Sequence, residues 1–294
     1  MEATYQALIQ RFLEIKKDEL LSKHTTLMIG GQADLFWECR DVRKLPEFLD
    51  HLKKLSLKFF ILGGGSNVLF DSRGFRGCVI KIVDNSFEFD DDNLIAASGT
   101  RMTILAKMTM QQGLSGLEWA NGIPGTIGGA VFGNAGCHGQ DISRNLSKAV
   151  LYSPNKGIFE AEKGYFQFSY RHSILKTSQD IVLKAYLKLQ KKAVNFEQSQ
   201  QAVSFRNDKQ PFGLSSGSFF KNSLNDSAGR LIEAVGLKGC QIGQAQISPK
   251  HANFFMNLGG ATSDDILALR DLAKQKVAEK FHINLEEEVV IVDC

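Results

Sequence analysis

The sequence lacks the features that mark several classes of protein. Its five cysteines and six histidines are scattered, without the spacing of a metal site or a disulfide framework. No apolar run is long enough to cross a bilayer, and the N-terminus does not resemble a signal peptide. A net charge of +3 is too small to favour nucleic acid or a membrane surface as a partner. We therefore expect a cytoplasmic protein with no metal, no membrane segment and no nucleic-acid partner.

The sequence does contain an unusual glycine cluster between two apolar runs. In the segment 59–70, a predicted short strand enters three consecutive glycines, Gly63–Gly65, which are followed by Ser66 and Asn67. Glycine permits a positive φ and a close ligand approach, so such a turn can direct several N–H groups at an anion such as a pyrophosphate. The segment is not a P-loop, and Val68 stands where a Rossmann fingerprint needs its third glycine. The alternative is a tight turn between two strands.

A second glycine-rich segment, 118–136, is predicted to form a loop with few charges. Residues this small let a large flat group contact the backbone, although they also suit close packing between helices or strands. Two such segments in one chain, one suited to a pyrophosphate and one to a flat group, together indicate a dinucleotide.

The rest of the chain alternates helical and strand patterns. Apolar spacing predicts a helix over 5–13, and a strand, a helix and a strand lead into the triple glycine as a small α/β unit. The aromatic segment 166–173 is either a substrate clamp or the edge of an aromatic strand. Turn residues near Lys209–Pro211 suggest a domain boundary. Further strands are predicted at 78–82, 93–98, 149–153, 181–189 and 254–256, and further helices near 45–52, 104–113, 231–236 and 263–277.

Several motifs, taken together and in order, resemble those of the UDP-N-acetylenolpyruvoylglucosamine reductase (UDP-N-acetylmuramate dehydrogenase) family, flavoenzymes of peptidoglycan precursor synthesis. The resemblance runs from about Thr25 to Val292. It implies an α+β chain with a two-part FAD-binding region of the vanillyl-alcohol-oxidase type and a C-terminal substrate-binding domain. The implied ranges are 1–70 for FAD-binding subdomain 1, to which the strand 289–294 returns, 71–209 for subdomain 2, and 210–288 for the substrate-binding domain. The motifs are Gly63–Leu69, Gly122–Gly129, Tyr170–Ser173, Gly217–Asn222 and Leu285–Val289.

The resemblance also implies a reaction. FAD would be bound, NADPH would be the co-substrate, and flavin N5 would deliver hydride to the β-carbon of UDP-N-acetylglucosamine enolpyruvate. Ser218 would protonate the α-carbon to give UDP-N-acetylmuramate, while Arg171 and Glu288 would stabilise the substrate carboxylate. The cofactor would contact Gly63, Gly64, Gly65, Ser66, Asn67, Gly122, Ile123, Thr126, Gly128 and Arg206. The substrate or NADPH would contact Tyr170, Lys209, Asn222 and Lys250.

The chain departs from the family pattern at Met28, where the family often has a basic residue, and at Ser223, where proline is usual. It lacks the tyrosine-bearing loop of the longer subclass, so it resembles the shorter subclass. We expect a monomer. Two other functions fit the residues alone, a different FAD-dependent oxidase of the same fold and a non-catalytic nucleotide-binding module. Consumption of NADPH without peroxide would exclude the first, and NADPH turnover with the enolpyruvyl UDP-sugar would exclude the second.

Overall fold

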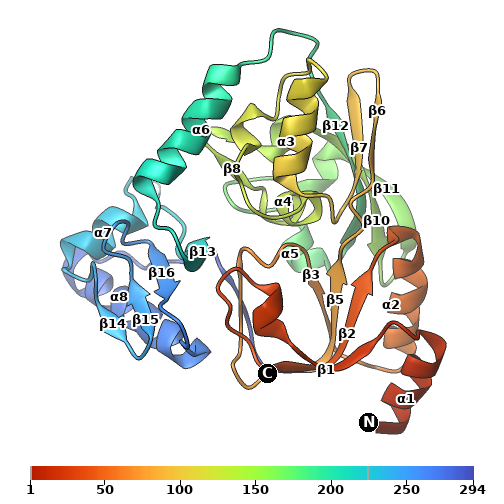
Figure 1. Ribbon diagram of the computed structural model, residues 1–294, viewed down its shortest axis with the longest axis horizontal. Helices are drawn as coiled ribbons and strands as arrows, with labels where there is room; N and C mark the ends of the chain where they lie inside the picture. Colours follow the sequence, from red (N-terminus) through yellow and green to blue (C-terminus); the bar gives the residue numbers. More distant parts are fainter. Residues whose placement is uncertain (1, 224) are drawn as a thin grey trace. The chain divides into compact units, whose positions relative to one another are not determined.

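The computed structural model describes residues 2–223 and 225–294. The chain divides into two compact units whose segments alternate along the sequence (Figure 1). It passes from one unit to the other five times, once within the triple glycine and once within helix α6. Unit 1 comprises Met1–Lys16, Leu35–Gly64 and Gly77–Ser204, and unit 2 comprises Lys17–Asp34, Gly65–Arg76 and Phe205–Cys294.

The first part of unit 1 is built from helices and strands around an aromatic core. Helices α1 and α2 confirm the two expected helices, and Phe48 on the apolar side of α2 packs against Trp37 in this core. Pro46 is tolerated at the start of α2, because the first N–H groups of a helix have no intrahelical acceptor. The succession β2, α2, β3 confirms the predicted strand–helix–strand order, and β3 runs parallel to β5. The strand order of the sheet is β1-β2-β5-β3, and β1 (Lys16–Leu20) belongs to unit 2 except for its first residue. The other elements are α1 (Glu2–Arg11), β2 (Gln32–Cys39), α2 (Leu45–Lys54), β3 (Phe59–Leu62) and β5 (Phe75–Ile82).

A second sheet in unit 1 is antiparallel, in the order β11-β10-β12-β7-β6. Its core holds the fully buried Trp119 and Phe166 beside residues of helices α3 and α4. Helix α4 corrects the prediction of a loop over the second glycine-rich segment. It forms in spite of its glycines because Thr126 caps its N-terminus and because its side chains pack against other parts of the chain. The elements are β6 (Phe87–Asp90), β7 (Asn93–Ala97), α3 (Met102–Gln111), α4 (Ile127–Gly133), β8 (Gly136–Cys137), β9 (Gln140–Asp141), β10 (Leu146–Ser153), β11 (Gly157–Glu162), α5 (Leu175–Ser178), β12 (Ile181–Lys188) and α6 (Phe196–Lys209).

Unit 2 packs helices α7 and α8 on an antiparallel sheet in the order β13-β16-β15-β14. Phe219 and Phe255 stack in its core with ring centroids 4.5 Å apart. The expected N-terminus of α8 is confirmed by a capping box between Thr262 and Asp265. Strand β17 pairs in parallel with β4. The elements are β4 (Val68–Phe70), β13 (Leu214–Ser218), α7 (Ala228–Ala234), β14 (Gln241–Ile242), β15 (Ala245–Ile247), β16 (Phe254–Asn257), α8 (Ser263–Phe281) and β17 (Val290–Val292).

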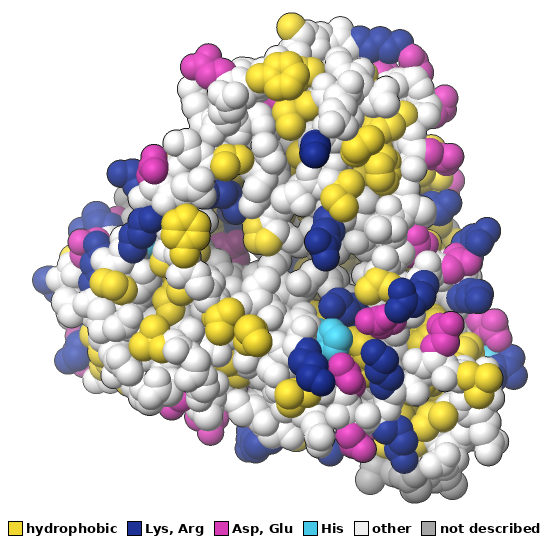
Figure 2. Space-filling view, in the orientation of Figure 1, with side chains coloured by type: hydrophobic (Ala, Val, Ile, Leu, Met, Phe, Trp, Pro, Cys, Tyr) yellow, Lys and Arg dark blue, Asp and Glu magenta, His cyan; other side chains and the backbone are white. Residues whose placement is uncertain are grey.

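The mixture of helices and strands agrees with the predicted α+β class. Acidic and basic side chains are interspersed on the face drawn in Figure 2, as the small net charge leads one to expect. Across the residues that the structure describes, every helix is too short or too polar to span a membrane. The ranges 1–70, 71–209 and 210–288 remain a prediction, because compact units need not coincide with binding regions.

Candidate active site

The triple glycine forms the turn between β3 and β4, and these two strands belong to different sheets. The segment is therefore a turn between two strands, as the alternative states, but the strands that it joins do not pair with each other as a hairpin. The backbone N–H groups of Gly64, Gly65 and Ser66 donate no hydrogen bond to any residue in 2–223 or 225–294. Successive N–H groups without protein acceptors can bind an anion, so the turn fits the expected pyrophosphate.

The two glycine-rich segments contact each other inside unit 1. A Cβ atom added to Gly63 would lie 2.6 Å from Thr126 Oγ1, and one added to Gly64 would lie 2.9 Å from the Cα atom of Gly125. Both positions therefore require glycine because of contacts within the protein. A larger residue at Gly64 would disturb this contact whether or not the loop binds a phosphate, so it would not test the pyrophosphate assignment by itself.

Helix α4 begins where these segments meet. Thr126 Oγ1 accepts a 3.4 Å hydrogen bond from Gly129 N, and a Cβ atom on Gly128 would lie 2.8 Å from that of Ser98. Ser98 is 2% exposed, and its hydroxyl has no hydrogen-bond partner among the described residues. A buried hydroxyl without a protein partner, next to closely packed glycines, fits a polar ligand such as the expected FAD.

Four other residues are expected to contact the cofactor, two in unit 1 and two in unit 2. In unit 1, Gly122 has a φ of 81° and Ile123 belongs to the buried core. In unit 2, Gly65 has a φ of 64° and packs against the backbone of His24, while Arg206 is half-buried on α6. These contacts explain the glycines, and the ligand contacts of the four residues remain a prediction.

Arg171 lies at the tip of a tight turn and not on a strand. The backbones of Ser169 and His172 exchange two hydrogen bonds of 3.1 Å, so the strand-edge interpretation of 166–173 is wrong. Arg171 has a φ of 55°, which lies in the left-handed region. This conformation costs a residue other than glycine about 1–2 kcal/mol. Such backbone strain concentrates at functional sites, which agrees with the clamp interpretation.

The end of the second glycine-rich segment supports this turn. Arg171 Nη2 donates a 2.7 Å hydrogen bond to Gly136 O, and Asn134 Nδ2 donates a 2.9 Å hydrogen bond to Ser169 O. The Arg171 guanidinium carbon also lies 5.2 Å from the centroid of the Tyr170 ring, within the range of a cation–π contact. Sequence reasoning missed Asn134 and Gly136 as supports, because hydrogen bonds between residues 35 positions apart leave no local pattern.

Ser218 ends β13 after a local irregularity in the strand. The register of β13 against β16 shifts between Ser215 and Ser218, and Gly217 has a φ of 77° within that shift. A bulge of this kind changes the direction of the side chain that follows it. The Ser218 hydroxyl has no hydrogen-bond partner in the described part of the chain, so it is available to a ligand.

The acidic C-terminal motif pairs with the residues that follow Ser218. Glu288 N donates a 2.8 Å hydrogen bond to Phe219 O, and Asn67 Nδ2 donates a 3.1 Å hydrogen bond to Glu288 O. Unit 2 therefore brings together Ser218, Glu288 and Asn67, three expected site residues that are far apart in the sequence. Arg171 belongs to unit 1.

The two acidic neighbours of Glu288 have structural partners. Glu286 lies 3.1 Å from the ammonium group of Lys221, and its side chain is 74% exposed. Glu287 lies 2.9 Å from the ammonium group of Lys274. The interpretation of the motif as a solvated acidic face is therefore correct for Glu286. Glu288 differs from Glu286 because its backbone pairs with the residue after Ser218.

The remaining expected substrate residues occupy different positions in unit 2. Lys250 Nζ donates a 2.8 Å hydrogen bond to Asn207 O and lies 5.4 Å from the centroid of the Phe212 ring. Asn222 Oδ1 accepts a 3.1 Å hydrogen bond from the first N–H group of α7, so this residue also has a structural role. Lys209 is exposed at the end of α6. Their contacts with a substrate remain a prediction.

Glu118 supports the second glycine-rich segment although the motifs do not single it out. It is 2% exposed, and its carboxylate accepts hydrogen bonds from Ser115 Oγ at 2.6 Å, Gly116 N at 2.7 Å and Asn195 N at 3.3 Å. Burial raises the pKa of this carboxyl group, but the hydrogen bonds outweigh burial and hold the pKa below its usual range. Glu118 therefore joins the start of the segment to the chain that leads into α6.

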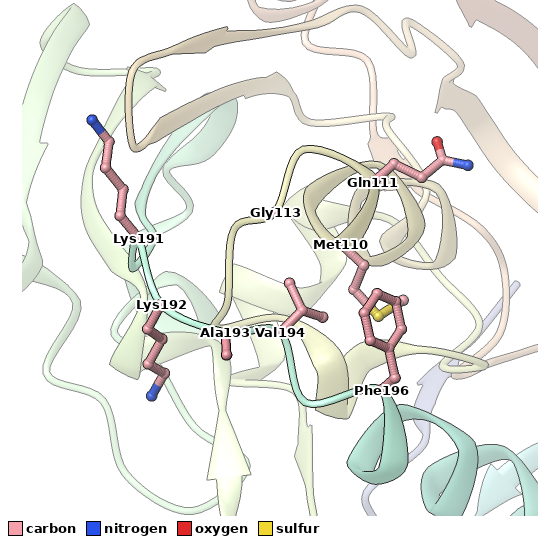
Figure 3. A pocket seen from close by; sticks show the side chains of 8 residues that line it. All are labelled: Met110, Gln111, Gly113, Lys191, Lys192, Ala193, Val194 and Phe196. Atoms are coloured by element: carbon pink, nitrogen blue, oxygen red, sulfur yellow. The ribbon is translucent and has the colours of Figure 1, made fainter.

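A shallow depression in unit 1 is lined by other residues (Figure 3). Met110, Val194 and Phe196 supply its apolar side, and Lys191 and Lys192 project from the segment that precedes α6. Every residue that lines it differs from those expected at the site, so the depression is not the candidate active site.

Known proteins resemble this chain over nearly its whole length. One family model, described as an FAD binding domain, matches residues 33–153, and another, described as the C-terminal domain of UDP-N-acetylenolpyruvoylglucosamine reductase, matches residues 209–292. The UDP-N-acetylenolpyruvoylglucosamine reductase of Bacillus pumilus is 39% identical over 285 residues, which cover 95% of this chain and 94% of that protein. The crystal structure of UDP-N-acetylenolpyruvylglucosamine reductase from Thermus caldophilus superposes with a TM-score of 0.80 at 31% identity and covers 93% of this chain and 97% of that one. Phl p 4.0202, a glucose dehydrogenase, has a TM-score of 0.51 at 11% identity over 64% of this chain and 44% of its own, which shows likeness of fold alone.

Proposed function

The chain belongs to the UDP-N-acetylenolpyruvoylglucosamine reductase family, and we propose that Ser218 completes the family's reaction here by protonating the substrate α-carbon. Members of this family are FAD-dependent oxidoreductases of peptidoglycan precursor synthesis that use NADPH. The substrate would be UDP-N-acetylglucosamine enolpyruvate and the product UDP-N-acetylmuramate. The expected cytoplasmic location and monomeric state stay predictions.

The chain's own contribution to cofactor binding would come mainly from backbone. The N–H groups of Gly64, Gly65 and Ser66 would bind the diphosphate, which is supported by their lack of protein acceptors in the described residues. The backbone at Gly122–Gly128 would lie along the dinucleotide. FAD, when bound, supplies a carrier that accepts hydride from NADPH and passes it to the β-carbon of the enol.

Addition of hydride leaves negative charge on the α-carbon and its carboxylate. Arg171 would stabilise this charge through its guanidinium group, and the strained turn supports that role because it holds the arginine in one conformation. Glu288 would have to be protonated in this step, so that its O–H group donates a hydrogen bond to the same carboxylate.

Ser218 would then deliver the proton to the α-carbon. A serine hydroxyl is a weak acid, so it needs neighbours that stabilise the alkoxide, and Lys209 is the expected one. The observation that carries the proposal is the pairing of the two chain segments beside Ser218 and Glu288, where Phe219 O accepts from Glu288 N at 2.8 Å. That pairing brings the end of β13, which carries the available Ser218 hydroxyl, beside the segment that carries Glu288.

A stopped-flow experiment on the two half-reactions tests this role. Reduction of the flavin by NADPH requires no proton delivered to carbon, whereas reoxidation by the enolpyruvyl substrate does. Ser218→Ala should leave flavin reduction within a few-fold of wild type and should slow reoxidation by roughly 10²–10⁴, the usual effect of losing a positioned acid. Ser218→Cys should retain part of the second half-reaction, since a thiol can also donate a proton.

The matched control is Ser223→Ala, an exposed serine in the same segment, which should behave as wild type in both halves. If Ser218→Ala slowed both half-reactions equally, Ser218 would be supporting the flavin site or the turn, and the acid would have to be another group, first of all Glu288.

A further inference from the structure

Lys81 and Arg101 are brought to the place where the two glycine-rich segments meet. Strands β3 and β5 lie side by side (Figure 1). In this parallel pair Lys81 lies opposite Leu62, the residue before the triple glycine. A Cβ atom on Gly99 would lie 2.8 Å from Ile82 O, so the segment that carries Arg101 crosses the chain directly after Lys81. Both basic residues belong to unit 1.

Arg101 also joins the second glycine-rich segment. It forms an isolated antiparallel bridge with Thr126, and Met102 N donates a 3.1 Å hydrogen bond to Gly125 O. Thr126 is the residue that a side chain on Gly63 would strike. The backbone of each basic residue is therefore tied, through one or two neighbours, to the contact between the glycine-rich segments.

The two positive charges influence each other. Burial lowers the pKa of the half-buried Lys81, the Glu38 carboxylate raises it, and Arg101 and Lys16 lower it by smaller amounts. Arg101 is exposed, and its guanidinium has no carboxylate partner in residues 2–223 and 225–294. Two cations held near each other repel, and an anion bound beside them would reverse the sign of that interaction.

We propose that Lys81 and Arg101 bind the diphosphate of FAD. This inference rests on the proposed function and adds charged side chains to the backbone N–H group of Gly64, which belongs to the same unit. Arginine can form two parallel hydrogen bonds to a phosphate, and lysine acts as a compact charge, so the pair suits a diphosphate. The glycine-rich segments would leave room for the dinucleotide, and the two cations would bind its negatively charged diphosphate.

This role predicts discrimination by the number of phosphates. FAD carries two phosphates, FMN carries one and riboflavin carries none, while all three share the isoalloxazine ring. Contacts made only to the diphosphate should strengthen binding of FAD most and leave riboflavin unaffected. Because the contacts are electrostatic and partly exposed, their effect should fall as salt rises.

The test uses the full chain freed of flavin and titrated with riboflavin, FMN and FAD, with binding measured by flavin fluorescence at low and high salt. The variants are Lys81→Gln, Arg101→Gln and the double variant. Lys107→Gln is the matched control, an exposed lysine on α3. Thermal melting by circular dichroism is measured for each protein, so that loss of binding can be separated from loss of folding.

Each single variant should weaken FAD binding by roughly 10-fold at low salt, the lower end of the range for hydrogen bonds to charged groups, because the site is partly exposed. Riboflavin binding should stay within twofold of wild type, and the double variant should show a smaller salt dependence for FAD. Lys107→Gln should match wild type with all three flavins.

Unchanged FAD affinity in the double variant would overturn the inference and leave the proposed function intact. An equal loss for riboflavin and FAD in a variant that melts like wild type would also overturn it, since the residues would then act on the flavin ring or its surroundings. If the wild-type chain bound none of the three flavins, the proposed function itself would fail.

Discussion

Loss of the buried carboxylate of Glu118 should destabilise unit 1 strongly. Glu118→Ala removes the acceptor for Gly116 N, Asn195 N and the Ser115 hydroxyl, and Glu118 is only 2% exposed. A buried donor without an acceptor costs about 1–3 kcal/mol. The serine hydroxyl can rotate to another acceptor, but the two N–H groups are fixed by the backbone, which gives a loss of about 3 kcal/mol in the free energy of unfolding. For a domain of about 150–250 residues this corresponds to a fall in Tm of about 6–12 °C.

The same site predicts a pH dependence with a definite sign. The pKa of Glu118 is lower in the folded protein than its ordinary value, so the unfolded chain binds a proton more readily. The stabilisation by Glu118 is fully present above the unfolded pKa near 4.3 and is lost as pH falls through the lower folded pKa. Wild type should therefore lose more stability between pH 6 and pH 3.5 than Glu118→Ala does.

The assay is thermal melting followed by circular dichroism at both pH values, with Glu88→Ala as the control. Glu88 is an exposed glutamate on β6 of the same unit, so its removal should change Tm little and keep the wild-type pH dependence. The reasoning would be refuted if Glu118→Ala melted within about 2 °C of wild type at pH 7, because the fixed N–H groups would then have found other partners.

Three further predictions follow from single contacts. Arg171→Gly should leave Tm within a few degrees of wild type, because glycine adopts the left-handed backbone without strain and this gain offsets the lost hydrogen bond. The same variant should slow reoxidation of the flavin by the enolpyruvyl substrate in stopped-flow. A large fall in Tm would show that the arginine is mainly structural. Asn67→Ala should slow the same half-reaction more than flavin reduction, since it releases the Glu288 carbonyl, and equal effects on both halves would contradict this. Tyr152→Phe should cost about 1 kcal/mol in urea unfolding, because the hydroxyl bonds the Asp50 carboxylate, and no measurable change would refute that contribution.

Local sequence patterns predicted most of the helices and strands. The capping residues of α8 and the apolar spacing of α2 are short-range signals, and the structure confirms both elements. Helix α4 escaped prediction because glycine has low helix propensity and the packing of Gly128 on Ser98 is a tertiary contact. The turn at Arg171 escaped for a related reason, since a left-handed φ at an arginine is unusual and its supports are distant in the sequence.

The candidate site was predictable as a set of motifs but not as a geometry. The order of the motifs implied the family, and the comparisons confirm it. Sequence could not reveal that the backbone of Glu288 bonds the carbonyl of Phe219, the residue after Ser218. It also could not reveal that Gly63 and Gly64 lie so close to the second glycine-rich segment that a side chain would strike it. These facts depend on strand pairing and close packing between residues that are far apart in the chain.

The central claim is that this chain carries hydride from NADPH through FAD to an enolpyruvyl UDP-sugar. The most direct measurement is the visible spectrum of the purified full chain under anaerobic conditions, first alone, then after NADPH, then after UDP-N-acetylglucosamine enolpyruvate. Flavin bands should be present at the start, bleach with NADPH, and return when the enolpyruvyl substrate is added. Bands that stayed bleached with this substrate and returned only with oxygen, with formation of peroxide, would contradict the claim and favour an oxidase of the same fold.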